Sequence, residues 1–269
     1  PQSRMSCFLL IDPQSDFHPG GSLGIPTADA DAERIAELLS LRPTPFEALY
    51  VTLDSHHKYD IAHPGYWRVA ETGEPPAPFT LITDADVSSG KFVPSDPSNL
   101  AWAKSYTSQL AAKGSFTLCI WPEHCLMGSP GHNVYPPIYA GVNAWLGNNP
   151  GKEVKWVMKG QNVKTEMYSC LSAEVPLEED GATQFNEGLM KELVAFEKVY
   201  VAGQAKSHCV NFTVRDMVSH YPPAGDKSKV VVLEDCMSSV PGFEGEGDKF
   251  LEDMRKEGVT VAKAADIKA

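Results

Sequence analysis

The sequence predicts an α/β protein in which a mainly parallel sheet of six strands carries helices on both faces, as in a doubly wound fold. Three observations support this fold class. Short apolar runs are continuous instead of alternating, helical segments separate them, and 269 residues suffice to bury a sizeable core. Strands that are apolar along their whole length are typical of a sheet that is covered on both sides. We interpret residues 1–269 as a single domain.

The strands are predicted from runs rich in β-branched or aromatic residues, each ending near a polar or glycine-containing turn. The first five are Cys7–Ile11, Leu49–Leu53, Val154–Met158, Val199–Ala202 and Val230–Leu233. A sixth strand is predicted at Gly258–Ala262, after the last helix. Helices are predicted at Ala30–Leu41, Glu187–Phe196, Val210–His220 and Gly247–Glu257. This alternation of strand and helix is typical of a parallel sheet.

Two stretches interrupt the alternation. Residues 70–114 contain a proline-rich run followed by a predicted helix at Leu100–Lys113, and we interpret them as an insertion between core elements. Residues 129–151 are rich in glycine, proline and asparagine and have no strong period. We therefore expect a second, loop-rich insertion there.

The overall composition is that of an ordinary globular protein. Lysine and arginine total 23 against 35 aspartate and glutamate residues, giving a net charge of −12 with the positive charges scattered, which argues against a nucleic-acid partner. No apolar run approaches a membrane span of roughly 18 residues, and residues 1–7 lack a signal-peptide pattern. We therefore expect a cytoplasmic protein without membrane attachment. The six cysteines include no CxxC pair, so neither a disulfide framework nor a thiolate zinc cluster is expected.

Chemically active side chains follow several predicted strands. Asp12 follows the first strand, an Asp54-Ser55-His56 triplet ends the second, Lys159 ends the third, and Cys209 lies between the fourth strand and a helix. The carboxyl ends of parallel strands meet at one edge of the sheet, where ligands bind. Singly, each residue also has a structural interpretation as a turn, a solvated charge or a buried thiol. Their convergence favours a functional site.

Cys209 is the candidate nucleophile of this site. A thiol at the start of a helix experiences the positive end of the helix dipole, and a nearby lysine favours the thiolate further. Asp12 could then act as general base and acid, taking the thiol proton and delivering it to a leaving amine. The alternative is that Cys209 is a buried, inert residue before a helix.

A metal site is a second candidate. The side chains of Asp54 and His56 occupy alternate positions, so in an extended segment they point to one side. His124, in the segment Trp121-Pro122-Glu123-His124-Cys125, can supply a further ligand. One aspartate and two histidines leave coordination positions open, as a catalytic metal requires. Surface histidines that bind nothing are the alternative.

Taken together and in order, these motifs resemble the isochorismatase-like cysteine hydrolases, and among them the nicotinamidase and pyrazinamidase branch. The matching segments span most of the chain. They are Asp12-Pro13-Gln14-Ser15-Asp16-Phe17 with Pro19-Gly20-Gly21, Asp54-Ser55-His56, Trp121-Pro122-Glu123-His124-Cys125, Lys159, Glu166-Met167-Tyr168-Ser169, and Gly203 to Val210.

The resemblance implies a catalytic triad of Asp12, Lys159 and Cys209. In this family the thiolate attacks an amide carbonyl, the aspartate moves the proton that lets ammonia leave, and the lysine holds both groups by its charge. The resemblance also implies that the oxyanion is bound by the backbone N–H groups of Ala205 and Cys209, after a cis peptide bond between Gln204 and Ala205.

The resemblance further implies one divalent metal ion, held by Asp54, His56 and His124, that orients the substrate ring. We expect zinc, although this ligand set also accepts manganese or iron. Three aromatic residues would flank the ring, although Tyr168 could equally be a core residue. These residues are Phe17, Trp121 and Tyr168. A small amide as substrate and assembly into homo-oligomers are also implied.

The sequence departs from the family pattern in two places. His57 stands where members usually carry a proline, and either Asp60 or His63 could be the polar residue expected beside the metal. The insertion at residues 70–114 is larger than in compact nicotinamidases and could reshape the pocket. Nicotinamide is the expected substrate. Another small amide or ureido compound is the enzymatic alternative, a vinyl-ether-cleaving isochorismatase would lack the cysteine, and a catalytically silent binding protein is the non-enzymatic alternative.

Overall fold

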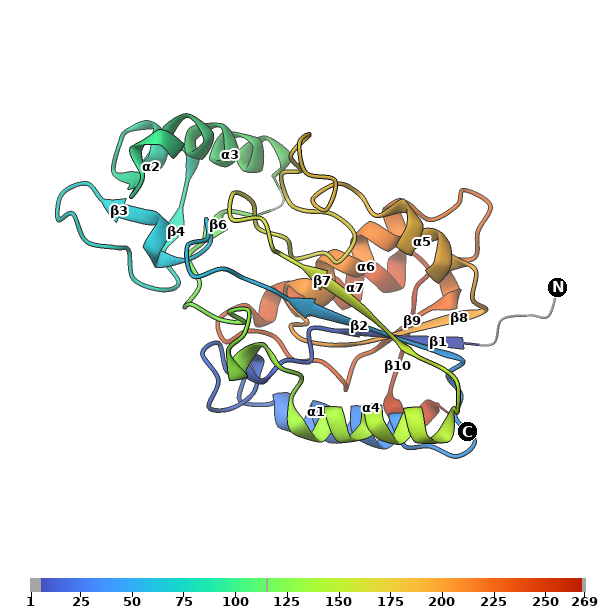
Figure 1. Cartoon of the computed structure of the whole chain (residues 1–269). Helices are drawn as coiled ribbons and strands as arrows, with labels where there is room; N and C mark the ends of the chain where they lie inside the picture. Colours follow the sequence, from blue (N-terminus) through green and yellow to red (C-terminus); the bar gives the residue numbers. More distant parts are fainter. Residues whose placement is uncertain (1–5, 115, 268–269) are drawn as a thin grey trace.

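The centre of the molecule is a six-stranded parallel sheet (Figure 1). The computed structural model describes residues 6–114 and 116–267. The strand order is β10-β9-β8-β1-β2-β7. The strands are β1 (Ser6–Ile11), β2 (Ala48–Asp54), β7 (Val154–Lys159), β8 (Lys198–Gly203), β9 (Val230–Leu233) and β10 (Thr260–Ala262). All six predicted strands are therefore present, and the predicted fold class is confirmed.

Helices cover both faces of this sheet. Helices α1 (Ala28–Leu39) and α4 (Pro136–Asn148) lie side by side on one face, and α5 (Glu187–Val194), α6 (Cys209–Ser219) and α7 (Glu244–Lys256) lie on the other (Figure 1). Alternate residues of β1 therefore enter two different cores. Leu9 belongs to the cluster that contains residues of α6 and α7, whereas Phe8 belongs to the cluster that contains residues of α1 and α4.

Helix α4 corrects the prediction for residues 129–151. A loop-rich stretch was expected there, but residues 136–148 form a helix that packs against α1. Its two prolines stand in the first turn, where the missing N–H groups cost nothing. A Cβ atom on Gly141 would lie 2.9 Å from the Cα of Ala36, so this glycine permits the close approach of the two helices. The glycines and prolines that suggested loops are thus compatible with a packed helix.

The segment between β2 and β7 also builds two small antiparallel pairs, β3 with β5 and β4 with β6. Its elements are β3 (Trp67–Val69), β4 (Leu81–Ile82), α2 (Asp84–Ser88), β5 (Phe92–Pro94), α3 (Leu100–Lys113) and β6 (Leu118–Cys119). Helix α3 matches the predicted helix, whereas strands of two or three residues are too short to show a period. These elements lie beside one end of the sheet (Figure 1).

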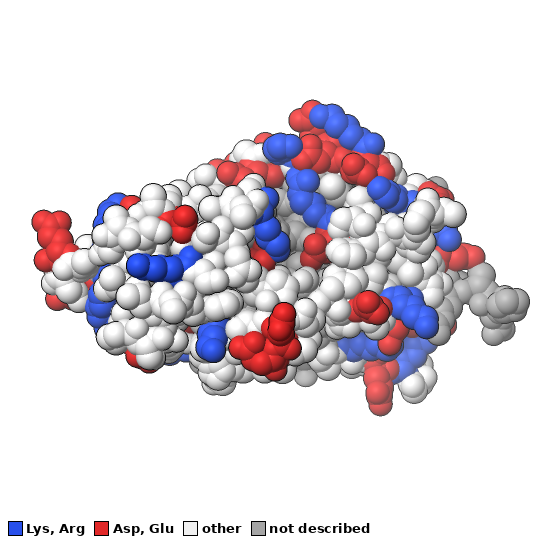
Figure 2. All heavy atoms as spheres, turned by 90° about the horizontal axis from the view of Figure 1, so that it is seen from above, with Lys and Arg blue, Asp and Glu red and all other residues white. Residues whose placement is uncertain are grey.

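The remaining helical segments are short 3-10 turns. They are Ser15–Phe17, Pro64–Tyr66, Pro97–Asn99, Pro130–His132, Lys227–Lys229 and Ala264–Asp266. Within residues 6–114 and 116–267, every helix falls short of the length and apolar character that a membrane crossing requires. Acidic and basic side chains are interspersed over the face shown in Figure 2.

Candidate active site

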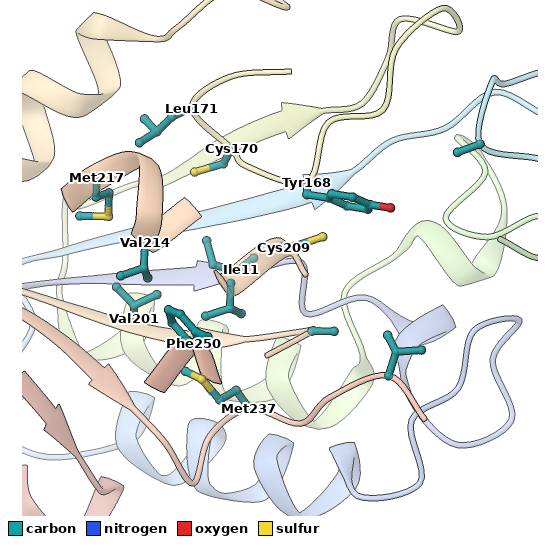
Figure 3. Packing of buried hydrophobic residues seen from close by; sticks show 14 of the residues in the cluster. Ile11, Tyr168, Cys170, Leu171, Val201, Cys209, Val214, Met217, Met237 and Phe250 are labelled. Atoms are coloured by element: carbon teal, nitrogen blue, oxygen red, sulfur yellow. The ribbon is translucent and has the colours of Figure 1, made fainter. Parts of the chain in front are cut away.

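The predicted active-site residues meet at the carboxyl end of the sheet. Asp12 follows β1, Asp54 is the last residue of β2, Lys159 is the last residue of β7, and Cys209 is the first residue of α6, which follows β8. Strands β8, β1, β2 and β7 are neighbours in that order, so four successive strand ends contribute. Figure 3 shows Cys209 at the start of its helix, near the Tyr168 ring. The sequence thus predicted this convergence.

Lys159 lies at the centre of the group. Its Nζ is 3.0 Å from Asp12 Oδ2, 2.9 Å from Asp54 Oδ1 and 3.5 Å from Cys209 Sγ. It also donates a hydrogen bond to the Met167 carbonyl at 2.8 Å. Burial opposes the charged form of Lys159, but the two carboxylates outweigh burial and raise its pKa well above the usual range. Lys159 is therefore a buried ammonium group that attracts three potentially negative groups.

Asp12 is fixed in place by the neighbouring strand. The backbone N–H of Asp12 donates to Thr52 Oγ1 at 2.9 Å, and the Thr52 hydroxyl donates back to Asp12 Oδ1 at 2.5 Å. The φ angle of Asp12 is 42°, in the left-handed region that non-glycine residues rarely adopt. Burial raises the pKa of Asp12, against the effect of Lys159. A carboxylate with a raised pKa is a stronger base and is better suited to accept a thiol proton.

Cys209 is buried beside this carboxylate. Burial raises the pKa of its thiol well above the usual range, although Lys159 acts in the opposite direction. Oxygen atoms of Asp12 and Asp54 and the Sγ of Cys209 all lie within 4.8 Å of one another. Burial thus favours the protonated thiol, and a carboxylate lies close enough to remove its proton.

The segment that leads from β8 to Cys209 has a special backbone. Gly203 has a φ angle of 118°, and a Cβ atom there would lie 2.0 Å from the Ile11 carbonyl oxygen, so only glycine allows β8 to approach β1 so closely. The peptide bond between Gln204 and Ala205 is cis, as the family resemblance implies. Ala205 lines the same pocket as Cys209. Its N–H and that of Cys209 remain the predicted oxyanion donors.

Histidine side chains gather on the other side of Asp54. The Nε2 atoms of His56 and His124 lie 3.1 and 3.3 Å from Asp54 Oδ2. Ring nitrogens of His56, His63 and His124 lie within 4.8 Å of one another, and all three residues are buried. Of the two residues that could complete the site, His63 thus joins the cluster directly. Asp60 instead contacts His56 Nδ1 at 3.2 Å.

The cluster suits a divalent metal ion. Each histidine places its Nδ1 near an oxygen: that of His56 near Asp60, that of His63 at 3.2 Å from the His57 carbonyl, and that of His124 at 2.8 Å from the Pro122 carbonyl. Such contacts orient metal-binding imidazoles and leave Nε2 for the metal.

The Nε2 atom of His63 independently indicates a metal site. It is buried and has no hydrogen-bond partner. A buried polar atom without a partner is costly, and a metal ion would remove that cost. The three histidines and Asp54 Oδ2 would hold it. The carboxylates near Cys209 are less suitable, because the Lys159 ammonium already lies between them.

A small pocket joins these two groups of residues. It is lined by predicted residues from both groups and by the three predicted aromatic walls, Phe17, Trp121 and Tyr168. The indole N–H of Trp121 donates to the Tyr168 hydroxyl at 3.0 Å. Sequence reasoning missed four further lining residues, which are Leu23, Glu166, His208 and Val240. Glu166 and His208 lie within the sequence segments that resemble the family. Their position in these segments was the one signal in the sequence that could have identified them as pocket residues.

The comparisons with known proteins agree with this geometry at the level of the fold. No protein-family model and no curated protein matches the chain. Solved structures match over almost its whole length. A nicotinamidase pyrazinamidase from Acinetobacter baumanii has 22% sequence identity and a TM-score of 0.65, with 99% of each chain covered.

Two further structures extend this likeness. A pyrazinamidase from Pyrococcus horikoshii in complex with zinc has 19% identity and a TM-score of 0.56, covering 96% of this chain and 99% of that chain. An isochorismatase family protein from Desulfovibrio vulgaris has 16% identity and a TM-score of 0.53, covering 98% and 96%. The chain therefore has the isochorismatase-like hydrolase fold, as its motifs predicted. Identities this low establish the fold and leave the activity to be argued from the site.

Proposed function

We propose that the protein is an amidohydrolase that converts nicotinamide to nicotinate and ammonia through a thioester on Cys209. The observation that carries this proposal is the Lys159 ammonium, which contacts Asp12, Asp54 and the Cys209 sulfur within 3.5 Å. A buried cation among a base and a thiol suits a nucleophile that must be activated by proton transfer. The histidine cluster and the aromatic walls support a ring-bearing amide as the substrate.

In the first half of the reaction, Asp12 takes the proton from the Cys209 thiol. The sulfur attacks the amide carbonyl, and the N–H groups of Ala205 and Cys209 donate to the developing oxyanion. Asp12 then delivers its proton to the amide nitrogen, so the carbon–nitrogen bond breaks and ammonia leaves. The charge of Lys159 stabilises the carboxylate and the thiolate throughout.

In the second half, water hydrolyses the thioester. Asp12 accepts a proton from the water as its oxygen attacks the acyl carbon, and the carbon–sulfur bond breaks. The proton returns to the thiolate and restores the resting thiol, and the product leaves as nicotinic acid, which gives up its carboxyl proton to solvent to become nicotinate. A divalent metal ion held by Asp54, His56, His63 and His124 would supply an electrophile for the ring nitrogen. We expect zinc, because a zinc complex is known for the similar Pyrococcus pyrazinamidase.

The test is ammonia release from a panel of small amides that includes nicotinamide, pyrazinamide and a ureido compound. Wild type with zinc should hydrolyse nicotinamide and pyrazinamide, and Cys209→Ala should not. Cys236→Ala is the matched control, because Cys236 is equally buried but lies in the core on the α1 and α4 face. If the enzyme hydrolysed only the ureido compound, the substrate would be a ureido compound and not nicotinamide. A panel without any turnover would overturn the proposed activity.

A further inference from the structure

A larger cavity lies beside the pocket that contains Cys209. Its volume is about 580 Å³, against about 20 Å³ for the pocket itself. Tyr168 and His208 line both spaces, and their ring centroids are 5.1 Å apart. We call the larger space the outer chamber and define it by six of its lining residues. These are Leu81, Phe116, Tyr168, His208, Phe212 and Phe243.

One part of the outer chamber wall is aromatic, and the rest of the lining includes polar and charged residues. The Phe116 ring lies 5.0 Å from Tyr168, and the Phe212 ring lies 5.2 Å from Tyr168. On the other side, the Phe243 ring lies 4.9 Å from His208. These centroid distances are those of favourable aromatic pairs. An aromatic surface therefore continues from the small pocket into the chamber, and it suits an apolar or aromatic ligand group.

The charged residues around the chamber balance one another. Arg215 and Lys249 both donate to Asp253 Oδ2, at 2.8 and 2.7 Å. Arg215 also donates through Nε to Asn211 Oδ1 at 2.6 Å. With Glu246, the lining contains two acidic and two basic residues. A charged ligand group would have to displace these pairs, so the chamber favours a neutral one.

The sizes of the two spaces indicate how a ligand would occupy them. About 20 Å³ is room for roughly one water molecule, whereas 580 Å³ is within the usual range of ligand pockets. A substrate ring therefore requires the small pocket to widen, and a widening at Tyr168 and His208, which line both spaces, would join the pocket to the chamber.

We propose that the outer chamber binds an aromatic or branched apolar extension on the acyl part of a neutral primary amide. This proposal rests on the proposed amidohydrolase function and extends it to larger substrates. Tyr168, predicted to flank the acyl ring, also lines the chamber, so an extension of that ring would enter the chamber where the two spaces join. Leu81, 51% exposed, belongs to the segment 70–114 and would cover the extension at the chamber mouth.

Binding to the zinc-supplemented Cys209→Ala protein tests the chamber without requiring turnover. The probes are nicotinamide and its derivatives with one phenyl group at each free ring carbon, measured by calorimetry. At least one phenyl derivative should bind about tenfold more tightly than nicotinamide, because the added ring buries apolar area. Adding Leu81→Asp should remove this gain and leave nicotinamide binding within twofold. Leu100→Asp is the matched control, because Leu100 is 36% exposed in the same segment but lies outside the chamber lining.

The outcomes separate the two proposals. Phenyl derivatives that all bind no more tightly than nicotinamide would overturn the chamber proposal, as would a gain that survives Leu81→Asp. Hydrolysis of nicotinamide by wild type tests the proposed activity alone. Tight, Leu81-dependent binding of a phenyl derivative without hydrolysis of any amide would reject the activity and retain the chamber as a site for neutral aromatic groups.

Discussion

The two halves of the candidate site are built in different ways. The cysteine half consists of Asp12, Lys159 and Cys209, which stand next to β1, at the end of β7 and at the start of α6. The histidine half consists of Asp54, His56, His63 and His124, of which Asp54 alone belongs to a regular strand of the main sheet. The sheet fixes the first half, whereas hydrogen bonds within loops orient the second.

Asp54 joins the two halves. Its Oδ1 accepts from Lys159 at 2.9 Å, while its Oδ2 lies 3.1 and 3.3 Å from His56 and His124. The two oxygens of the Asp54 carboxylate therefore contact different halves of the site. A change in either half should therefore be detected in the other.

The largest effect is expected from Lys159→Met. This change leaves Asp12, Asp54 and the thiolate close together without their buried cation, so kcat/KM for nicotinamide should fall by about 10³-fold or more. Lys155→Met is the matched control on the same strand, because Lys155 is half-exposed and pairs with Glu192. Its kcat/KM should stay within about twofold. Steady-state ammonia release measures both, and a Lys159→Met protein within tenfold of wild type would contradict the role of the lysine.

A smaller, graded effect is expected for metal affinity. His63→Ala and His124→Ala each remove a ligand, so zinc should be lost on dialysis. Asp60→Asn removes only the orienting contact to His56 and should weaken affinity by about tenfold. His220→Ala, at the exposed end of α6, should retain the metal. Elemental analysis and chelator competition measure these differences. Full metal content in His63→Ala would remove His63 from the ligand set.

The smallest effect concerns the loop between β7 and α5, whose Met167 carbonyl accepts a hydrogen bond from Lys159. In that loop the Glu174 N–H donates to the Glu166 carbonyl, and burial raises the pKa of Glu174 to about 8. In the unfolded chain Glu174 has the ordinary glutamate pKa of about 4.5 and in the folded chain a pKa of about 8, so folding stability falls as the pH rises between these values.

Glu174→Gln should abolish this part of the pH dependence. The urea midpoint of the variant, relative to that of wild type, should rise between pH 5 and pH 8 and change little above that range. Glu178→Gln is the control, because Glu178 is exposed in the same loop. If the urea midpoints of Glu174→Gln and wild type instead differed by the same amount from pH 5 to pH 8, Glu174 would already be ionised in the folded protein at pH 5.

The difference between the cysteine half and the histidine half also explains what could be predicted from the sequence. Asp12, Lys159 and Cys209 follow apolar runs, and the ends of parallel strands meet, so their convergence could be expected. His63 lies in an irregular segment, where neither period nor spacing indicates position. The hydroxyl of Thr52 holds Asp12, yet in the sequence Thr52 resembles any other β-branched strand residue. Helix α4 was missed because its prolines and glycines serve helix initiation and close packing.

The central claim is that Cys209 carries the acyl group during turnover. Wild type mixed with nicotinamide and quenched in acid within one turnover should yield a nicotinoyl thioester, detected by mass spectrometry on the peptide that contains Cys209. The other five cysteines should remain unmodified. Ammonia release with an unmodified Cys209 peptide, or an acyl group on a different residue, would contradict the account.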